Sequence, residues 1–540
     1  MLRSNWRLIF LLAISAVALY IYSGSYGVVE TSDARYAEIA REMYVSGDYL
    51  HPRLLDIHHY HKPPVTYQLT AIAYGIFGVK AFAARFFLQL AVLFQLVLVY
   101  ALGLLLFDNR KSALWAAGIY FSFPIVLIST RSLTTDAFLT TFVLISLYAW
   151  VKYRKENKVL FLYLFTLSLA LGFLTKGPVV FIVPLSFILF YNRVEKAKSG
   201  IKYHHLLAWL LFLVVGTSWY LYLVGQNPDF LDYFLGRQTA DRFARDVFGR
   251  TEPFWYFIVL APAAGIPWLI VMFALVLSRR ELVPVKSING ALLLGILIPL
   301  VFFSISSSKR ILYILPFYSL AALLTANLIA GQREKGAKIL NNILLGYVML
   351  FCITLILIRY FLHDYTIPLF FSIAGIAGIL IFIYVHNSGL IHPGSRPILM
   401  TYLLAVILVV GSSTFMASNE LKINSPAPLT DFIQANDLNN RLVLVYNSRQ
   451  PSIAFELNRS VISLYDGSSA LARETQFESD SQWKKYFVDM REETDLTYLK
   501  EILQRPAVLI TFNEKLPDKR KWMLEHFEHE KRFGKYTVYF

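Results

Sequence analysis

The sequence predicts a polytopic α-helical membrane protein with a small α/β domain at its C-terminal end. Of the 540 residues, 56% are hydrophobic and 16% are charged, whereas an average soluble domain has about 25% charged residues. Apolar runs long enough to cross about 30 Å of hydrocarbon recur along the chain. Beyond residue 418 these runs stop and charged residues become frequent. We therefore expect a membrane domain at 1–418 and a soluble α/β domain at 419–540.

Apolar length predicts about thirteen membrane spans. The first apolar run, Leu8 to Tyr22, is interpreted as a retained helix, because no small-residue cleavage site follows it and further spans do. The apolar stretch 66–80 is expected to be a short tilted or re-entrant helix, and it is not counted. The expected spans are 8–23, 83–106, 112–129, 136–151, 159–175, 177–191, 205–224, 255–277, 289–306, 311–330, 339–360, 367–385 and 397–415.

The net charge of +15 is distributed unevenly. With the N-terminus in the cytoplasm, Lys and Arg crowd every second connection between spans, as membrane topology requires. Most of the positive charge is therefore topological, and no nucleic-acid partner is expected. The same bias predicts four segments on the outer, periplasmic face: 24–82, the turn at 132–136, the loop 225–254, and everything after about 416.

The two long outer segments, 24–82 and 225–254, have the pattern of helices that lie on the membrane surface. In the C-terminal domain, 442–446, 507–511 and 535–540 read as strands, and 430–436 and 495–504 read as helices. The chain has no Gly-rich phosphate loop, so direct use of a nucleotide sugar or ATP is not expected. With Cys352 as the single cysteine, a disulfide within the chain is excluded.

Acidic residues at expected helix starts on the outer face are the candidate catalytic groups. Asp33 follows the first span, and Asp136 begins the fourth. Each has two interpretations: a helix N-cap that stabilises the first turn, or a carboxylate that acts as base or electrostatic stabiliser in glycosyl transfer. Glu30 is a further candidate for the role given to Asp33.

Basic residues are scarce on the outer face, so those present are informative. Each of them taken singly is expected to reach lipid headgroups. Together they suggest an anionic ligand such as a lipid phosphate or pyrophosphate. A cluster of histidines that includes His61 leaves a divalent metal open, although its spacing matches no tight metal motif. The candidate phosphate-binding residues on this face are Lys62, Lys176, Arg242 and Lys309.

Several motifs together resemble the bacterial lipid A aminoarabinose transferases and the related protein O-mannosyltransferases. Both are GT-C glycosyltransferases, which use polyprenyl-phosphate sugars. The resemblance covers about 420 residues and extends loosely into the C-terminal domain. The motifs are ETSDARYAEIAREM from Glu30, GDYLHPRLL from Gly47, Tyr60 to Pro63, Thr175 to Gly177, Pro253 to Tyr256, and Lys309 to Pro316.

The resemblance implies a GT-C fold with Asp33 and Asp136 as the two acids of the active site. It also implies that Lys62, Arg242, Lys309 and Tyr313 contact the lipid phosphate. The chain departs from the family at three points: it has Ser32-Asp33 for Asp-Glu, His61-Lys62-Pro63 for Glu-Lys-Pro, and Gln238-Thr239 for Glu-His. The last two sites are associated with metal in the aminoarabinose branch, so no cofactor is certain.

The function expected from these observations is that of an inner-membrane glycosyltransferase. It would move a sugar from an undecaprenyl-phosphate carrier to a periplasmic acceptor, which is lipid A, another glycolipid or a protein. Membrane lipids are the other expected partners. Two alternatives stay open: a transporter or flippase for lipid-linked glycans, which would need charged or broken helices at mid-membrane, and a non-catalytic scaffold for envelope partners.

Overall fold

The computed structural model describes residues 6–195, 203–241, 244, 251–469, 471, 475–513 and 515–540. The chain forms two compact units. The first, here called the membrane unit, comprises Met1–Ile21, Leu88–His363 and Ile367–Ser412. The second, the sheet unit, comprises Tyr22–Phe87, Asp364–Thr366 and Ser413–Phe540. The sheet unit thus includes the whole polar segment 24–82, which was expected to belong to the membrane domain.

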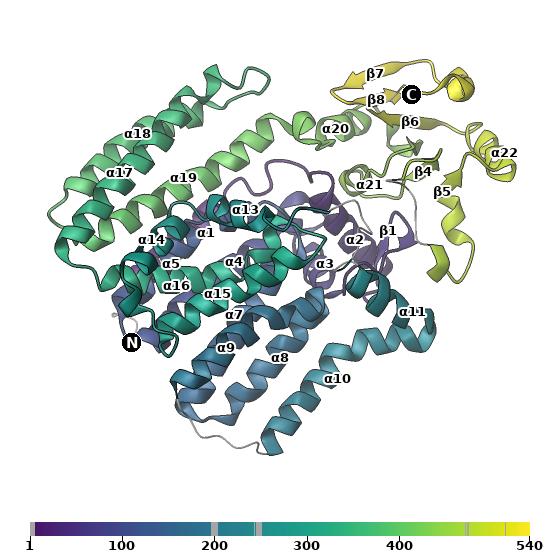
Figure 1. The fold of residues 1–540 in the computed structure, drawn as a ribbon. Coiled ribbons are helices and arrows are strands. Elements are labelled where there is room, and N and C mark those ends of the chain that lie inside the picture. The colour runs from purple at the N-terminus through teal and green to yellow at the C-terminus, as the bar shows by residue number, and fades with distance from the viewer. Residues whose placement is uncertain are drawn as a thin grey trace. The chain divides into compact units, whose positions relative to one another are not determined.

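The membrane unit is built almost entirely of helices (Figure 1). Short connecting helices, among them α11 (Asp229–Asp232), η3 (Tyr233–Asp241) and η5 (Ile311–Ile314), lie between the others. The longer helices are α1 (Trp6–Tyr20), α4 (Ala81–Phe107), α5 (Arg110–Phe121), α6 (Pro124–Ser129), α7 (Thr135–Glu156), α8 (Val159–Lys176), α9 (Ile182–Val194), α10 (Tyr203–Gln226), α13 (Tyr256–Ala264), α14 (Trp268–Ser278), α15 (Ile288–Ile305), α16 (Phe317–Ala330), α17 (Glu334–Leu357), α18 (Leu369–Asn387) and α19 (Arg396–Ser418).

Among the described residues, seven helices are long and apolar enough to cross a membrane. The pair α13 and α14 adds an eighth span if counted as one, although it bends by 106° at its break. Three shorter apolar helices accompany them, at Trp6–Tyr20, Pro178–Val194 and Phe317–Ala330. The chain is therefore a multi-pass membrane protein, but the expected count of thirteen spans is not confirmed.

Two of the expected spans are interrupted at prolines. The run 112–129 forms α5 and α6, with Pro124 at the first position of α6. The run 255–277 forms α13 and α14, with Pro267 immediately before α14. Proline has no backbone N–H and clashes with the preceding helical turn, so it starts a helix more readily than it continues one.

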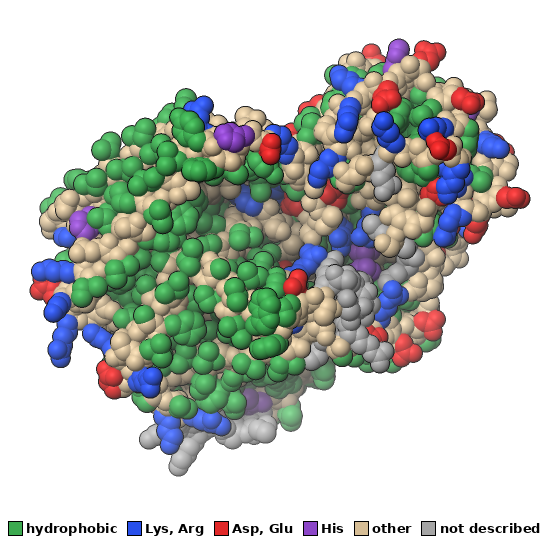
Figure 2. Space-filling model, turned by 45° about the horizontal axis from the view of Figure 1, so that its top comes forward, with side chains coloured by type: hydrophobic (Ala, Val, Ile, Leu, Met, Phe, Trp, Pro, Cys, Tyr) green, Lys and Arg blue, Asp and Glu red, His purple; other side chains and the backbone are tan. Residues whose placement is uncertain are grey.

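The surface of the membrane unit is strongly apolar. Large side chains such as Leu213 (53% exposed), Leu380 (66%) and Ile343 (60%) point outward from its helices. Figure 2 shows hydrophobic side chains covering much of the visible surface formed by these helices. Among the described residues from 413 onward, only Tyr498 is a large hydrophobic residue with an exposed side chain. The C-terminal part of the chain thus has the surface of a soluble domain.

The sheet unit contains a six-stranded sheet with the order β5-β4-β3-β6-β8-β7. The first four strands are parallel, and β8 and β7 continue the sheet antiparallel. The strands are β3 (Leu442–Tyr446), β4 (Ile462–Tyr465), β5 (Phe487–Asp489), β6 (Ala507–Phe512), β7 (Glu530–Phe533) and β8 (Tyr536–Tyr539). The accompanying helices include α20 (Ala427–Ala435), α21 (Pro451–Glu456) and α22 (Glu493–Ile502).

The N-terminal part of the sheet unit consists of two helices and a small hairpin. Helix α2 (Ser32–Ser46) carries the first candidate acid, and α3 (Val65–Phe77) is the short apolar helix expected at 66–80. Between them, β1 (Arg53–Leu54) pairs antiparallel with β2 (Ile57–His58). Gly47 ends α2 with a φ of 71°, a left-handed conformation that glycine adopts without steric cost.

Candidate functional site

Asp33 lies in the first turn of α2, where it forms a buried ion pair. Its Oδ2 accepts a hydrogen bond from Arg85 at 2.7 Å and another from the backbone N–H of Val29 at 3.2 Å. Arg85 itself is fully buried. The N-cap residue of α2 is Thr31, so Asp33 is not the cap, although a carboxylate in the first turn still complements the helix dipole.

Arg85 organises the backbone around Asp33. Its guanidinium also donates to the carbonyl oxygens of Ser23, Tyr26 and Gly27 at 2.9–3.1 Å, and it lies 4.0 Å from the centre of the Tyr26 ring. The sequence analysis did not select Arg85, because it lies within an apolar run interpreted as a span. The sequence nevertheless contained a signal for Arg85, because an arginine inside an apolar run requires a buried partner.

Glu30, the alternative first acid, is buried and bonded to the C-terminal part of the sheet unit. Its Oε1 accepts from the backbone N–H of Ser452 at 2.8 Å. Burial raises the pKa of Glu30 to about 7, while Ser452, Arg35 and Arg449 act in the opposite direction. Glu30 and Asp33 thus both accept a backbone N–H, but only Asp33 forms an ion pair with Arg85.

The membrane unit brings three of the candidate residues together. Asp136, in the first turn of α7, forms an ion pair with Lys176 at the end of α8, and both side chains are less than 10% exposed. The Lys176 ammonium also lies 4.1 Å from the centre of the Tyr313 ring. Thr134 is the N-cap of α7, so Asp136 is not the cap here either. A buried lysine that retains further N–H donors is suited to bind an anion.

Lys309 lies in the connection between α15 and η5, buried to 5% exposure. Its ammonium donates to the carbonyl oxygens of Glu252 at 2.6 Å and of Ser306 at 2.5 Å. Burial lowers the pKa of Lys309, and the Glu252 carboxylate acts in the opposite direction. Two backbone bonds leave one of three donors for a ligand.

The structure gives fewer contacts for the remaining candidates, Lys62, Arg242 and His61. Lys62 is half-buried in the turn after β2, and Arg242 lies outside the described residues. The rings of His59 and His61 lie 3.9 Å apart. In the described part of the chain, no three His, Cys, Asp or Glu side chains come together as a metal would require. The metal interpretation of His61 therefore gains no support from the geometry.

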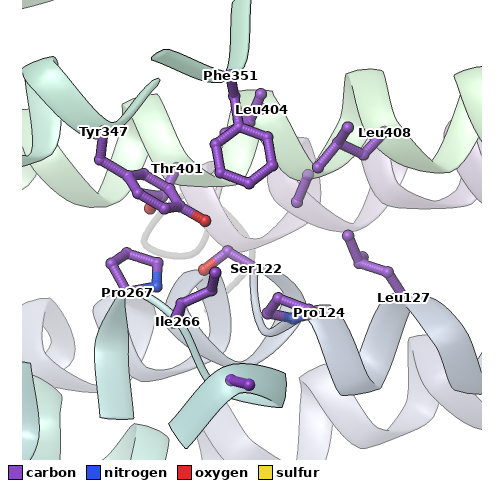
Figure 3. Close-up of a pocket in the computed structure, with 12 residues that line it drawn as sticks. Ser122, Pro124, Leu127, Ile266, Pro267, Tyr347, Phe351, Thr401, Leu404 and Leu408 are labelled. Atoms are coloured by element: carbon purple, nitrogen blue, oxygen red, sulfur yellow. The ribbon is translucent and has the colours of Figure 1, made fainter. Parts of the chain in front are cut away.

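A pocket of about 190 Å³ lies elsewhere in the membrane unit (Figure 3). It is next to the break between α13 and α14, and Ile266 and Pro267 from this break contribute to it. Its polar lining includes Ser122, whose hydroxyl accepts from the Trp268 indole at 2.8 Å. None of the candidate acids or bases lines this pocket. The lining residues are Ser122, Pro124, Leu127, Ala263, Ile266, Pro267, Tyr347, Phe351, Thr401, Leu404, Ala405 and Leu408.

Comparison with known proteins identifies relatives of the chain. Residues 6–234 match the family of dolichyl-phosphate-mannose-protein mannosyltransferases. An undecaprenyl phosphate-α-4-amino-4-deoxy-L-arabinose arabinosyl transferase of Pseudomonas fluorescens is 25% identical over 83% of this chain and 85% of its own length. A protein of the same name from Proteus mirabilis is 31% identical, over 58% of each chain.

Solved structures extend the likeness to the whole fold. The crystal structure of ArnT from Cupriavidus metallidurans bound to undecaprenyl phosphate matches 99% of this chain and 98% of its own, with a TM-score of 0.79 at 18% identity. The Archaeoglobus fulgidus oligosaccharyltransferase matches 96% of this chain and 70% of its own, with a TM-score of 0.51 at 13% identity.

The chain is a membrane glycosyltransferase. The resemblance drawn from its motifs is confirmed, and so is the expected fold class of a helical membrane protein with a small C-terminal sheet domain. Two buried ion pairs, Asp33–Arg85 and Asp136–Lys176, contain three of the candidate residues. Each places a carboxylate beside a cation in a site largely closed to water, where electrostatic interactions are strong.

Proposed function

We propose that this glycosyltransferase moves one sugar from an undecaprenyl-phosphate carrier to an acceptor on the periplasmic face of a bacterial inner membrane. The observation that carries the proposal is the likeness over 85% of the length of a transferase named for an undecaprenyl-phosphate sugar. The acceptor is proposed to be lipid A or another glycolipid, with protein as the alternative that the mannosyltransferase family match supports.

The proposed reaction is an inverting transfer. The acceptor nucleophile attacks the anomeric carbon, the bond from that carbon to the phosphate oxygen breaks, and the lipid phosphate leaves as an anion. Asp33 is assigned the role of the base that takes the proton from the acceptor nucleophile, while Arg85 holds the Asp33 carboxylate in place. Asp136 is the second acid. Positive charge that stabilises the leaving phosphate is assigned to Lys62, Lys176, Arg242 and Lys309, with Tyr313 as a further contact.

Periplasmic placement of the site and of the C-terminal domain belongs to this proposal. It is supported by the concentration of Lys and Arg in alternate connections.

One feature favours the flippase alternative, namely the broken span formed by α13 and α14. The pocket beside this break, however, has no ionisable lining residue other than Tyr347 among the described residues. A transported sugar phosphate needs cationic partners. The break therefore does not displace the transferase proposal.

The test is Asp33→Asn, which keeps the size of the side chain but removes its basicity. Transfer should fall about 100-fold or more, in the range of a positioned acid–base group, while undecaprenyl-phosphate binding is retained. Transfer is measured by mass spectrometry of lipid A and envelope proteins from a deletion strain that expresses each variant. The control is Asp518→Asn, an exposed acid of the sheet unit, which should transfer normally. An active Asp33→Asn beside an inactive Glu30→Gln would move the role to Glu30.

A further inference from the structure

The segment just before α2, residues 22–31, has no regular secondary structure. Several of its backbone N–H groups therefore bind partners from outside the segment. Gly27 N–H donates to Glu420 Oε1 at 2.7 Å, and Val28 N–H donates to Glu456 Oε1 at 2.7 Å. Both acceptors come from residues close to four hundred positions later in the chain. Two carboxylates of the C-terminal part thus hold two successive amides of this segment.

Two further bonds connect the same regions. The N–H of Glu30 donates to the carbonyl oxygen of Asn424 at 3.1 Å, and the Glu30 carboxylate accepts from Ser452 N–H at 2.8 Å. The approach at Gly27 is close: a Cβ built there would lie 2.6 Å from Glu456 Oε1 and 2.7 Å from Ser425 Oγ. No side chain fits at that position without displacing the contact.

The carbonyl side of the same segment is bound to Asp33 through Arg85. The guanidinium binds the carbonyl oxygens of Ser23, Tyr26 and Gly27, and it also binds Asp33. Gly27 is therefore held on its N–H side by Glu420 and on its C=O side by the arginine that fixes Asp33. The Val29 N–H, one residue after the Glu456 contact, donates directly to Asp33.

We propose that Glu456 and Glu420 are positioning residues for Asp33, and that they act through the backbone of Gly27 and Val28 and through Arg85. The inference rests on the proposed role of Asp33 and assigns a catalytic purpose to the C-terminal sheet domain. Neither glutamate touches substrate. Each glutamate fixes the segment 22–31. The carbonyl groups of this segment orient the Arg85 guanidinium, and the guanidinium holds the Asp33 carboxylate.

The electrostatic setting agrees with this geometry. Burial raises the pKa of Glu456 to about 7, while the Val28 N–H and Arg85 act in the opposite direction, and the charges of Glu420 and Asp431 raise it. The pKa of Glu420 is also raised, mainly by burial. Two half-buried carboxyl groups that repel each other are costly to maintain, and their bonds to the segment offset part of that cost.

The test compares three variants of the full-length protein. Glu456→Ala removes the acceptor, whereas Glu456→Gln retains an amide oxygen that can accept from Val28 N–H. Asp495→Ala is the matched control: it removes another carboxylate of the sheet unit that accepts a backbone N–H, that of Asp489 at 2.9 Å. Three measurements are made: hydrogen exchange of the peptide that spans Gly27 to Asp33, binding of undecaprenyl phosphate, and sugar transfer in the deletion strain.

We expect Glu456→Ala to speed exchange in this peptide and to lower transfer at least tenfold, with binding of undecaprenyl phosphate changed less than twofold. Glu456→Gln should restore most of the transfer, and Asp495→Ala should match the parent protein in all three measurements. Faster exchange with undiminished transfer would show a purely structural contact and overturn the proposal. So would an equal loss of transfer in the Asp495→Ala control.

The role of Asp33 is tested separately by Asp33→Asn. If that variant is inactive while Glu456→Ala transfers normally, the positioning inference fails and the proposed function stands. If Asp33→Asn transfers normally, the assigned base is wrong, whatever the exchange of the segment shows.

Discussion

Three buried ionisable side chains of the sheet unit, Glu38, Arg41 and Glu42, lie together beside Asp56. Arg41 binds Glu38 through two bonds of 2.7 Å. Both carboxylate oxygens of Glu42 accept from Asp56 N–H at 3.2 Å. The negative charges of Glu38 and Asp56 disfavour the ionised form of Glu42, so a proton on Glu42 relieves this repulsion.

The sheet unit should therefore become less stable to unfolding as the pH rises. Burial, followed by the charges of Glu38 and Asp56, raises the pKa of Glu42 well above its ordinary 4.5. The folded protein then binds more protons than the unfolded chain, so the contribution is fully present below about pH 4.5 and is lost as the pH rises through the raised pKa. We expect the temperature at the midpoint of thermal unfolding of the sheet unit to decrease as the pH is raised from 5 to 8.

Glu42→Gln should flatten this pH dependence, because it removes the titrating group and keeps an acceptor for Asp56 N–H. Glu528→Gln, which changes an exposed glutamate, serves as control and should leave the slope of the parent protein intact. Identical slopes in the parent and the Glu42→Gln protein would rule out Glu42 as the titrating group.

At individual positions, the sequence allowed candidate site residues to be selected, but it did not predict which of them contact each other. Asp136, Lys176 and Tyr313 were each selected, and the structure brings them together. Their contact was not predictable, because it joins residues from α7, α8 and η5. The N-cap interpretation of Asp33 and Asp136 was wrong by two positions in each case, since the caps are Thr31 and Thr134, which can also accept a backbone N–H.

At the scale of elements, the sheet was predicted closely. The expected strands 442–446 and 507–511 correspond to β3 and β6 within one residue. Both lie inside a parallel part of the sheet, where strands are buried on both faces and read as continuous apolar runs. The breaks at Pro124 and Pro267 were not expected, since hydropathy averages over a window and conceals a change of helix direction.

The central position of β6 leads to a prediction about packing. Leu509 is fully buried and pairs with Leu444 on one side and Tyr539 on the other. Leu509→Ala should lower the free energy of unfolding of the sheet unit by about 2–5 kcal/mol, through lost burial and a residual cavity. Native-state hydrogen exchange of the β3 and β6 amides measures this loss. Glu530→Ala, on the edge strand β7, should change it by less than about 0.5 kcal/mol; a similar loss there would contradict the assigned core.

At the scale of the whole molecule, the fold class was predictable because membrane spans and soluble domains differ in composition. The thirteen-span count stays a prediction, because the described helices include several that are apolar but short. The grouping of residues 22–87 with residues 413–540 was not predictable, because it depends on contacts such as that of Val28 with Glu456, far apart along the chain.

The proposed topology can be measured directly. Alkaline phosphatase, which is active only in the periplasm, should be active when fused after Gly225 and after Asn419. Fused after Asn157, between α7 and α8, it should be inactive, because the charge bias places that connection in the cytoplasm. An inactive fusion after Asn419 would overturn the periplasmic assignment of the C-terminal domain.

The discontinuous make-up of the sheet unit also has a consequence for biogenesis. Its first part, Tyr22–Phe87, leaves the ribosome more than 300 residues before its main second part, Ser413–Phe540. At 5–20 residues per second, translation of the intervening helices takes roughly 15–65 s. During this interval the amides of Gly27 and Val28 have not yet met their glutamates. We therefore expect the nascent N-terminal segment to need a chaperone at the membrane surface. We also expect a slow step in maturation, because the two parts of the sheet unit are far apart in the chain.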